Sequence, residues 1–359
     1  MKKFIECYLP IKACNFRCKY CYVTQNRWWN SERPNLERCC KNIKEATNKE
    51  RLGGECMFNI CATGETLLFP EIVEIARGIL ENGHYIMIVT NGTLKNRFEE
   101  FCDFPIELRK HLFFKCSFHY LELKRLNKLN VFFENINMLK KSEISFTVEL
   151  TPDDSYIPYI EEIKKVCMDN LGELCHVTVP RDERIKGYPL MTKLSREVFV
   201  KTWSSFNSAL FDFKESIFEV KRKEYCYAGK WGIVLNLETG EYKQCYKGKK
   251  LGNLYEDMDK PLNLKAVGHN CAEGHCHNGH AFLGFGLIPD INTPDYADMR
   301  NRVLNDGTQW LSKETEAFMR EKLKDSNKED NIFEKMYSDL YSFHYKKFLK
   351  GMVKKDNEQ

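Results

Sequence analysis

The first half of the chain alternates between two sequence periodicities, and this alternation restricts the folds that it can adopt. Six short apolar runs, rich in β-branched and aromatic residues, have the length of buried strands: residues 4–9, 56–61, 85–90, 113–119, 144–150 and 175–179. Stretches of helical periodicity separate them, at residues 35–49, 70–81, 94–112, 121–140 and 155–168. The pattern predicts an α/β fold with a parallel sheet, either doubly wound or curled into a partial barrel. An active site is then expected at the C-terminal ends of the strands.

The alternation stops near residue 180, and the chain beyond it predicts a different organisation. A helical pattern covers residues 195–221, and a hairpin-like stretch follows at residues 231–237 and 241–245. The glycine-, histidine- and cysteine-rich stretch 268–286 has too few aliphatic residues for a conventional core. Helical periodicity returns after it, so we expect the chain to end in helix.

Sixteen cysteines indicate the chemistry that the chain can carry. Glu6 and Pro10 interrupt the first apolar run, which is too short for an export signal, so we expect a cytosolic protein. In a long chain from a reducing compartment, clustered cysteines indicate metal binding rather than disulfides. Nine of the sixteen are scattered and are expected to be small buried apolar residues. The other seven form two sets with ligand-like spacing: Cys14, Cys18 and Cys21, then Cys226, Cys245, Cys271 and Cys276.

The first set directly follows the first predicted strand. Thiolates at Cys14, Cys18 and Cys21 could bind three irons of a cubane and leave the fourth iron open to another ligand. A zinc site that lacks its fourth ligand, or three incidental thiols, is the alternative. The spacing, with an aromatic residue before the last cysteine, resembles the signature of the radical S-adenosylmethionine (SAM) superfamily. That family also places its cluster loop just after the first strand.

Further segments resemble the parts of that family that bind SAM. Residues 62–68 are similar to its Gly-Gly-Glu-Pro-Leu segment, although threonines replace the first glycine and the proline. The resemblance implies that Gly64 lets the backbone come close and that Glu65 accepts from the SAM ammonium. Asn91 lies in a Thr-Asn-Gly turn like that of the family, which could equally be only a tight turn. The family often contacts the ribose at positions that correspond here to Ser117 and Glu149, although either could be a satisfied strand-end polar group.

The resemblance implies a partial (β/α)6 TIM-like barrel that binds a [4Fe–4S] cluster and SAM. One electron, from a donor such as flavodoxin or ferredoxin, cleaves SAM to methionine and a 5′-deoxyadenosyl radical. This radical then abstracts a hydrogen atom from a C–H bond of the substrate.

The second cysteine set resembles the SPASM and Twitch extensions of the same superfamily, from Cys226 through Gly240 to Cys245. A full SPASM domain needs more cysteines, so the better match is a Twitch-like domain with one auxiliary [4Fe–4S] cluster. A structural zinc site with four thiolates is the alternative. One nearby histidine could replace a thiolate, and the histidines concerned are His269, His275, His277 and His280.

The resemblance divides the chain into four expected parts. These are a radical SAM partial barrel at residues 1–180, a helical connector at 181–225, a Twitch/SPASM-like auxiliary cluster domain at 226–290 and a helical C-terminal segment at 291–359. Candidate substrate contacts follow the first and sixth strands: Arg27, Trp28, Trp29, Arg181, Arg184 and Lys186. Their alternative role is a solvated loop and an aromatic cover over the cluster.

Three functions remain open from the sequence. We expect oxidation or epimerisation of a small polar molecule or a glycoconjugate, because the cluster motif starts at residue 14 without a preceding leader-binding domain. The first alternative is a maturase that forms a thioether or C–C crosslink in a ribosomally made peptide. The second is a non-catalytic zinc protein that serves as an interaction scaffold.

The charge and hydropathy of the chain exclude other classes of partner. With 55 basic and 51 acidic residues, the net charge of +4 argues against a dedicated nucleic-acid binder, including an RNA-modifying enzyme. No apolar run approaches the length of a membrane-spanning helix, so we expect no membrane association.

Overall fold

A nine-stranded sheet forms the centre of the computed structural model, which describes residues 1–269, 271, 276 and 279–341. The strand order is β6-β5-β4-β3-β2-β1-β7-β8-β9. The strands are β1 (Lys3–Leu9), β2 (Cys56–Ala62), β3 (Tyr85–Thr90), β4 (Leu112–Ser117), β5 (Ser145–Leu150), β6 (His176–Val177), β7 (Gly232–Asn236), β8 (Glu241–Lys243) and β9 (Lys250–Asn253). β1 to β6 pair in parallel in sequence order, which confirms the predicted α/β partial barrel.

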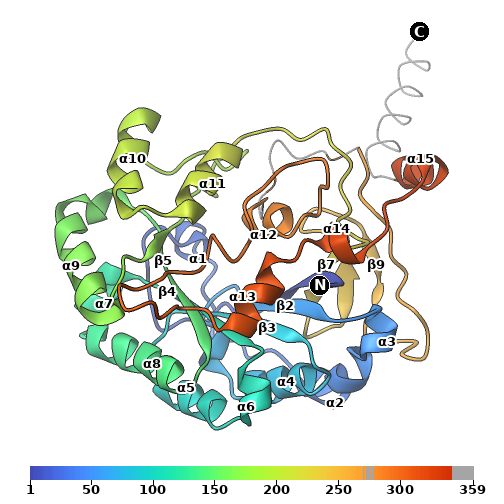
Figure 1. Cartoon of the computed structure of the whole chain (residues 1–359), viewed down its shortest axis with the longest axis horizontal. Helices are drawn as coiled ribbons and strands as arrows, with labels where there is room; N and C mark the ends of the chain where they lie inside the picture. The colour runs from blue at the N-terminus through green and yellow to red at the C-terminus, as the bar shows by residue number, and fades with distance from the viewer. Residues whose placement is uncertain (270, 272–275, 277–278, 342–359) are drawn as a thin grey trace.

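Helices connect the parallel strands and form an outer ring around the sheet (Figure 1). They are α1 (Tyr22–Gln25), α2 (Glu37–Ala46), α3 (Lys49–Leu52), η1 (Thr66–Leu68), α4 (Glu71–Leu80), α5 (Lys95–Cys102), α6 (Ile106–Arg109), α7 (Tyr120–Arg125), α8 (Leu129–Lys141), η2 (Asp154–Tyr159) and α9 (Ile160–Leu171). Each predicted helical stretch between strands contains at least one of them. The polar strand ends of the barrel are therefore brought to one rim.

The two faces of the sheet bury two separate cores, because successive strand residues point to opposite faces. In β1, Ile5 and Cys7 pack in the core under the outer helices, whereas Phe4 packs in the inner core. α12 (Gly279–Gly284) and α13 (Lys313–Arg320) contribute to that inner core. The expectation that residues 268–286 form no conventional core is wrong for its last part. Four residues of this last part are buried because they pack in the interior of the barrel: Ala281, Phe282, Leu283 and Phe285.

Beyond β6 the structure differs from the expected segments in two ways. The predicted helix at 195–221 is divided into α10 (Arg196–Trp203), η3 (Ser204–Phe206) and α11 (Ala209–Ile217). Asn207 adopts a left-handed conformation with φ of 48°, and the Ser208 hydroxyl caps α11 by accepting from the amide of Phe211. The predicted hairpin is confirmed as β7 and β8, but β7 also pairs in parallel with β1. The cysteine-rich segment and the barrel thus share one sheet.

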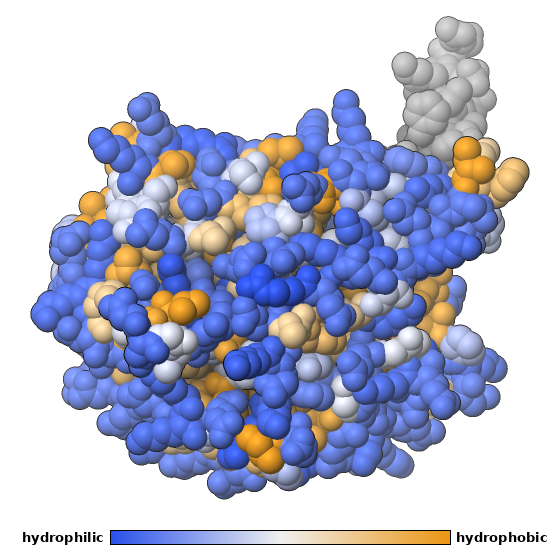
Figure 2. Space-filling model, in the orientation of Figure 1, coloured by the Kyte–Doolittle hydropathy of each residue, from blue (hydrophilic) through white to orange (hydrophobic). Residues whose placement is uncertain are grey.

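The chain continues through α14 (Leu323–Ser326) to α15 (Ile332–Tyr341), which lies at the edge of the molecule (Figure 1). α15 exposes apolar side chains, and Figure 2 shows an apolar patch over this helix on a face that is otherwise largely hydrophilic. None of the helices in the described ranges is long and apolar enough to cross a bilayer.

Phe318 of α13 holds the C-terminal segment against the sheet. Its ring is 4% exposed and stacks on Tyr85 at the start of β3, with 3.8 Å between the ring centroids. We expect Phe318→Ala to lower the free energy of unfolding by about 3 kcal/mol, because it leaves a cavity between helix and strand. Denaturant titration measures the change. Val198→Ala, at a position 47% exposed on α10, serves as the control, and equal losses in the two variants would contradict the packing role.

Candidate active site

The C-terminal ends of β1 to β4 surround one small cavity of about 80 Å³. The three cysteines of the first set line it together with four of the five residues expected to contact SAM: Gly64, Glu65, Asn91 and Ser117. The fifth, Glu149, lines a neighbouring cavity. Residues that are far apart in the sequence therefore converge where the parallel strands end, as the fold predicts.

Backbone hydrogen bonds fix the cysteine loop to the end of β2. The Gly64 amide donates to the Ile11 carbonyl at 2.5 Å, and the Glu65 amide donates to the Ala13 carbonyl at 3.0 Å. A Cβ atom at Gly64 would lie 2.1 Å from the Ala13 oxygen. Glycine is required here because the two backbone segments approach too closely for a side chain.

Glu65 connects the ends of β2 and β3 through a buried carboxylate that is 2% exposed. It accepts hydrogen bonds from the Leu67 amide at 3.0 Å, the Thr90 hydroxyl at 2.6 Å and the Asn91 amide at 2.8 Å. Burial raises the pKa of Glu65, and these three donors oppose the increase. The carboxylate thus has a structural role in the described chain, and its contact with a SAM ammonium stays a prediction.

Asn91 extends the same network to the cysteine loop. Its side-chain amide donates to the Asn15 side-chain oxygen at 2.7 Å and lies 3.9 Å from the Cys14 sulfur. Asn15 in turn donates to the Thr93 hydroxyl at 2.9 Å. The Thr-Asn-Gly turn is therefore more than a tight turn, because it orients the residue next to the first cysteine.

The three thiols of the first set are not activated nucleophiles in the described chain. Burial raises the pKa of Cys14 to about 12 and also raises the pKa values of Cys18 and Cys21. Such thiols are protonated at neutral pH, and metal binding would release their protons. The described residues contain no group of three or more His, Cys, Asp or Glu arranged around a single ion. The three thiols line one cavity, and thiolates are the ligands that iron–sulfur clusters require.

A second cavity of about 330 Å³ adjoins the first at the same rim. Cys21, Ser117 and His119 line both cavities. The far wall of the second cavity includes Cys276 and His280, which follow the cysteine-rich stretch. One space therefore reaches from the first cysteine set to a member of the second.

Glu149 lies on the wall of this second cavity and is already paired with cations. It forms salt bridges with Arg300, which is completely buried, and with Lys115 at 3.3 Å. Although burial alone would raise it, Lys115 and Arg300 hold the pKa of Glu149 well below its usual range. The predicted ribose contact would have to compete with these two partners.

Tyr20, the aromatic residue before the last cysteine, forms a polar network at the boundary between the cavities. Its hydroxyl lies 2.6 Å from Nδ1 of His119 and 3.1 Å from the hydroxyl of Tyr156. Burial lowers the pKa of His119 to about 4, so the ring is neutral at physiological pH. A neutral imidazole has one ring nitrogen that donates and one that accepts a hydrogen bond, so His119 joins this network without adding a charge beside the cysteines.

The second cysteine set shares one neighbourhood. Burial raises the pKa of Cys226, and negative charge on its neighbours would raise it further; these neighbours are Cys245, Cys271 and Cys276. Backbone hydrogen bonds with Gly268 hold Cys226 in place. His269 bonds to Asp339 at 2.9 Å, whereas His275 and His277 lie outside the described residues. The assignment of these four cysteines to a second metal site stays a prediction.

The other residues expected to contact substrate have different positions. Arg181 lines the second cavity, and Trp29 lines the first, where the Arg17 guanidinium lies 4.1 Å from its ring centroid. Arg184 pairs with Asp182 at 2.6 Å. Its side chain is 58% exposed and lines neither cavity. Exposed side chains are also found at Arg27, Trp28 and Lys186.

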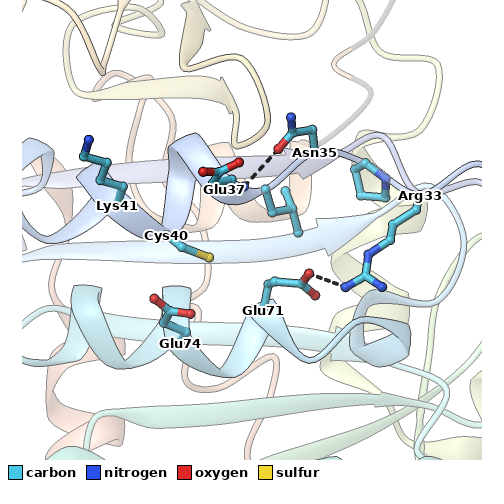
Figure 3. Close-up of a pocket in the computed structure, with 9 residues that line it drawn as sticks. Arg33, Asn35, Glu37, Cys40, Lys41, Glu71 and Glu74 are labelled. Carbon is cyan, nitrogen blue, oxygen red and sulfur yellow. Dashed lines mark hydrogen bonds and ion pairs between the residues drawn. The ribbon is translucent and has the colours of Figure 1, made fainter.

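Another hollow in the described surface lies away from these sites, between α2 and α4 (Figure 3). It has a volume of about 710 Å³, and an ion pair between Arg33 and Glu71 lies along it. Its one cysteine, Cys40, has a pKa raised to about 12 by burial and by Glu74, so it is not a reactive thiol at neutral pH. The groove contains no residue from the rim of the barrel and offers no comparable chemistry.

Comparison with known proteins agrees with the barrel. Residues 8–152, from β1 to the end of β5, match the model of the Radical SAM superfamily. No curated protein matches the sequence.

Among solved structures, the chain is similar to SuiB of Streptococcus suis bound to S-adenosylmethionine, with 14% identity and a TM-score of 0.45. The match covers 72% of this chain and 65% of SuiB, so the chain spans less than two thirds of that protein. It is also similar to anSMEcpe with bound AdoMet, at 15% identity and a TM-score of 0.47, over 71% of this chain and 79% of that protein. TYW1 with a lysine-pyruvate adduct matches at 13% identity and a TM-score of 0.35, over 56% of this chain and 70% of TYW1.

Measurements of the free energy of unfolding can test whether Glu65 holds the ends of β2 and β3 together. Glu65→Ala leaves three buried donors without an acceptor, and we expect it to lower the free energy of unfolding by about 3 kcal/mol or more. Glu65→Gln keeps one acceptor oxygen and should lose less. Denaturant titration of both variants is compared with Glu161→Ala, whose side chain is 88% exposed. If Glu65→Ala is as stable as that control, the carboxylate does not hold the strand ends together.

Proposed function

We propose, from the radical SAM superfamily domain that residues 8–152 form, that this enzyme cleaves SAM reductively and oxidises or epimerises a small polar substrate. One observation carries the proposal. A single cavity is lined by Cys21 of the first cysteine set and by Cys276 of the second. A substrate bound there would contact both metal sites.

The residues of the first cavity fit the cofactors of this family. Cys14, Cys18 and Cys21 would hold a [4Fe–4S] cluster, and the Gly64 backbone would approach SAM beside them. With both cofactors bound, such a domain supplies one-electron cleavage of SAM to methionine and a 5′-deoxyadenosyl radical, which abstracts hydrogen from a substrate C–H bond. The electron would come from a flavodoxin- or ferredoxin-type donor.

The chain's own residues position the reactants and limit side reactions. Glu65 and Asn91 fix the loop that carries Cys14, while Tyr20 and neutral His119 line the substrate space beside Cys21. Cys226, Cys245, Cys271 and Cys276 would hold an auxiliary [4Fe–4S] cluster. A cluster at that place could take up the electron that an oxidation releases.

The second cavity supports a small substrate. Its volume of about 330 Å³ lies in the range of roughly 300–1,000 Å³ that is typical of small-molecule sites. Charged side chains on its walls, among them Lys115, Arg181 and Glu183, favour a polar ligand. A modified peptide is the alternative product, and mass spectrometry of the product distinguishes the two.

Metal content tests the assignment of both cysteine sets. After anaerobic purification we expect about eight irons and eight sulfides per chain, falling to about four of each in a Cys14/Cys18/Cys21→Ala variant. About four irons that fall to none, with zinc present, would replace the auxiliary cluster by a structural zinc site. No iron in either protein after reconstitution would contradict the enzyme and favour a zinc scaffold.

Single substitutions separate SAM cleavage from product formation. Cys18→Ala should abolish 5′-deoxyadenosine formation, because the first cluster then lacks a ligand. Cys245→Ala should keep some SAM cleavage but lose the product. Cys102→Ala, at a half-buried cysteine outside both sets, serves as the control, and chromatography measures 5′-deoxyadenosine in all three. If Cys18→Ala cleaves SAM as fast as wild type does, the proposed function fails.

A further inference from the structure

Two lysines that no sequence motif indicated face the second cavity. Lys115 lies on β4 between Phe113 and Ser117, and strand alternation directs all three side chains to the interior of the barrel. Lys214 lies on α11, beyond the sixth strand, and lines the same cavity. A lysine in a barrel interior is unusual, because a buried ammonium loses its hydration.

Lys214 has no carboxylate partner among the described residues. Its ammonium donates a hydrogen bond to the hydroxyl of Thr178, which is neutral. Burial lowers the pKa of Lys214 to about 7, and the nearby cations Lys115 and Arg181 contribute to the decrease, against the opposing effect of Glu149. An anion in the cavity would offset the free-energy cost of burying a protonated Lys214.

Among the residues that the structure describes, the cations around the cavity outnumber the carboxylates. The positive side chains are Lys115, Arg181, Lys214 and Arg300, and the negative ones on or next to the wall are Glu149 and Glu183. With Lys214 protonated, four minus two leaves two positive charges. Glu6 lies deeper in the barrel, where burial raises its pKa; even if it is ionised, one positive charge remains. His280 adds none, because burial, with Lys214 and Arg300, keeps its pKa well below the usual range.

We propose that the substrate of this enzyme carries an anionic group, a carboxylate or a phosphate, and that Lys115 and Lys214 bind it in the second cavity. This inference rests on the proposed function, which makes the second cavity the substrate site, and it adds the chemical class of that substrate. The anion would complete the charge balance and accept hydrogen bonds from both ammonium groups. Lys115 and Lys214 are thus residues that determine specificity.

The carboxylate of SAM has the same chemistry and is the other source of such an anion. The geometry favours the substrate. Lys115 and Lys214 line the cavity that reaches Cys276, and neither lines the cavity that contains the three cysteines of the first set. The test must therefore separate anion binding from SAM binding.

Thermal unfolding of the cluster-loaded full chain provides this test, with inorganic phosphate and malonate as probes. Against sodium chloride at matched ionic strength, at least one probe should raise the Tm of wild type by about 3 °C at saturation. Lys214→Met and Lys115→Met should each weaken the apparent affinity for that probe at least about 10-fold. Lys214→Arg keeps the charge and should retain binding. Lys141→Met, at an exposed lysine of α8, should behave as wild type.

SAM binding is measured on the same proteins by equilibrium dialysis. We expect the Kd for SAM to stay within about two-fold of wild type in Lys214→Met, and phosphate or malonate to stabilise the SAM-bound enzyme as well. If SAM abolishes the effect of the probes and Lys214→Met weakens SAM binding 10-fold, the lysines serve SAM and the inference is wrong. It is also wrong if neither probe shifts the Tm beyond sodium chloride. If the probes bind but wild type forms no 5′-deoxyadenosine, the proposed function fails while the anion site remains.

Discussion

The C-terminal ends of β1, β2 and β3 are held together by hydrogen bonds that continue beyond the strands, and the rim of the barrel depends on them. Main-chain bonds from Gly64 and Glu65 fix the cysteine loop to β2, and the Glu65 carboxylate then holds the turn after β3. Asn91 returns the network to the loop beside Cys14. Because these links are contiguous and pass through the buried Glu65 carboxylate, we expect a change at one strand end to move the cysteines that follow another.

This network explains why one sequence segment can have two roles. The residues expected to contact SAM, Gly64 and Glu65, already fix the loop that carries the cysteines. A backbone that is held in place before the ligands bind lowers the entropy lost on binding. Threonine in place of the family's proline stabilises this turn, because the Thr66 hydroxyl accepts a hydrogen bond from the Ala62 amide at 3.0 Å.

The barrel could be predicted from the sequence because its signals are local. Strand and helix periods alternate regularly up to β6, and the spacing of Cys14, Cys18 and Cys21 lies in one loop. The lysines and Arg300 could not be predicted, because their meaning depends on contacts between distant segments: Arg300 reaches Glu149 across 151 positions of the chain. One signal was present in the sequence, because Lys115 is a cation that directly follows three apolar residues of β4. The break at Asn207 is a single-residue conformation, which periodicity does not detect.

The two cavities are lined in part by different segments of the chain. This difference suggests how the chemistry shared by the superfamily and the choice of substrate could be assigned to different segments. Residues of the matched family segment supply the whole lining of the first cavity, from Cys14 to His119. The second cavity adds residues from α11 and α12, such as Lys214 and His280, together with Cys276. If the second cavity is the substrate site that we propose, segments beyond the sixth strand would select the molecule that reaches the first cysteine set. Because α12 also packs its apolar side chains into the inner core, the wall proposed to select the substrate is anchored in the interior of the barrel.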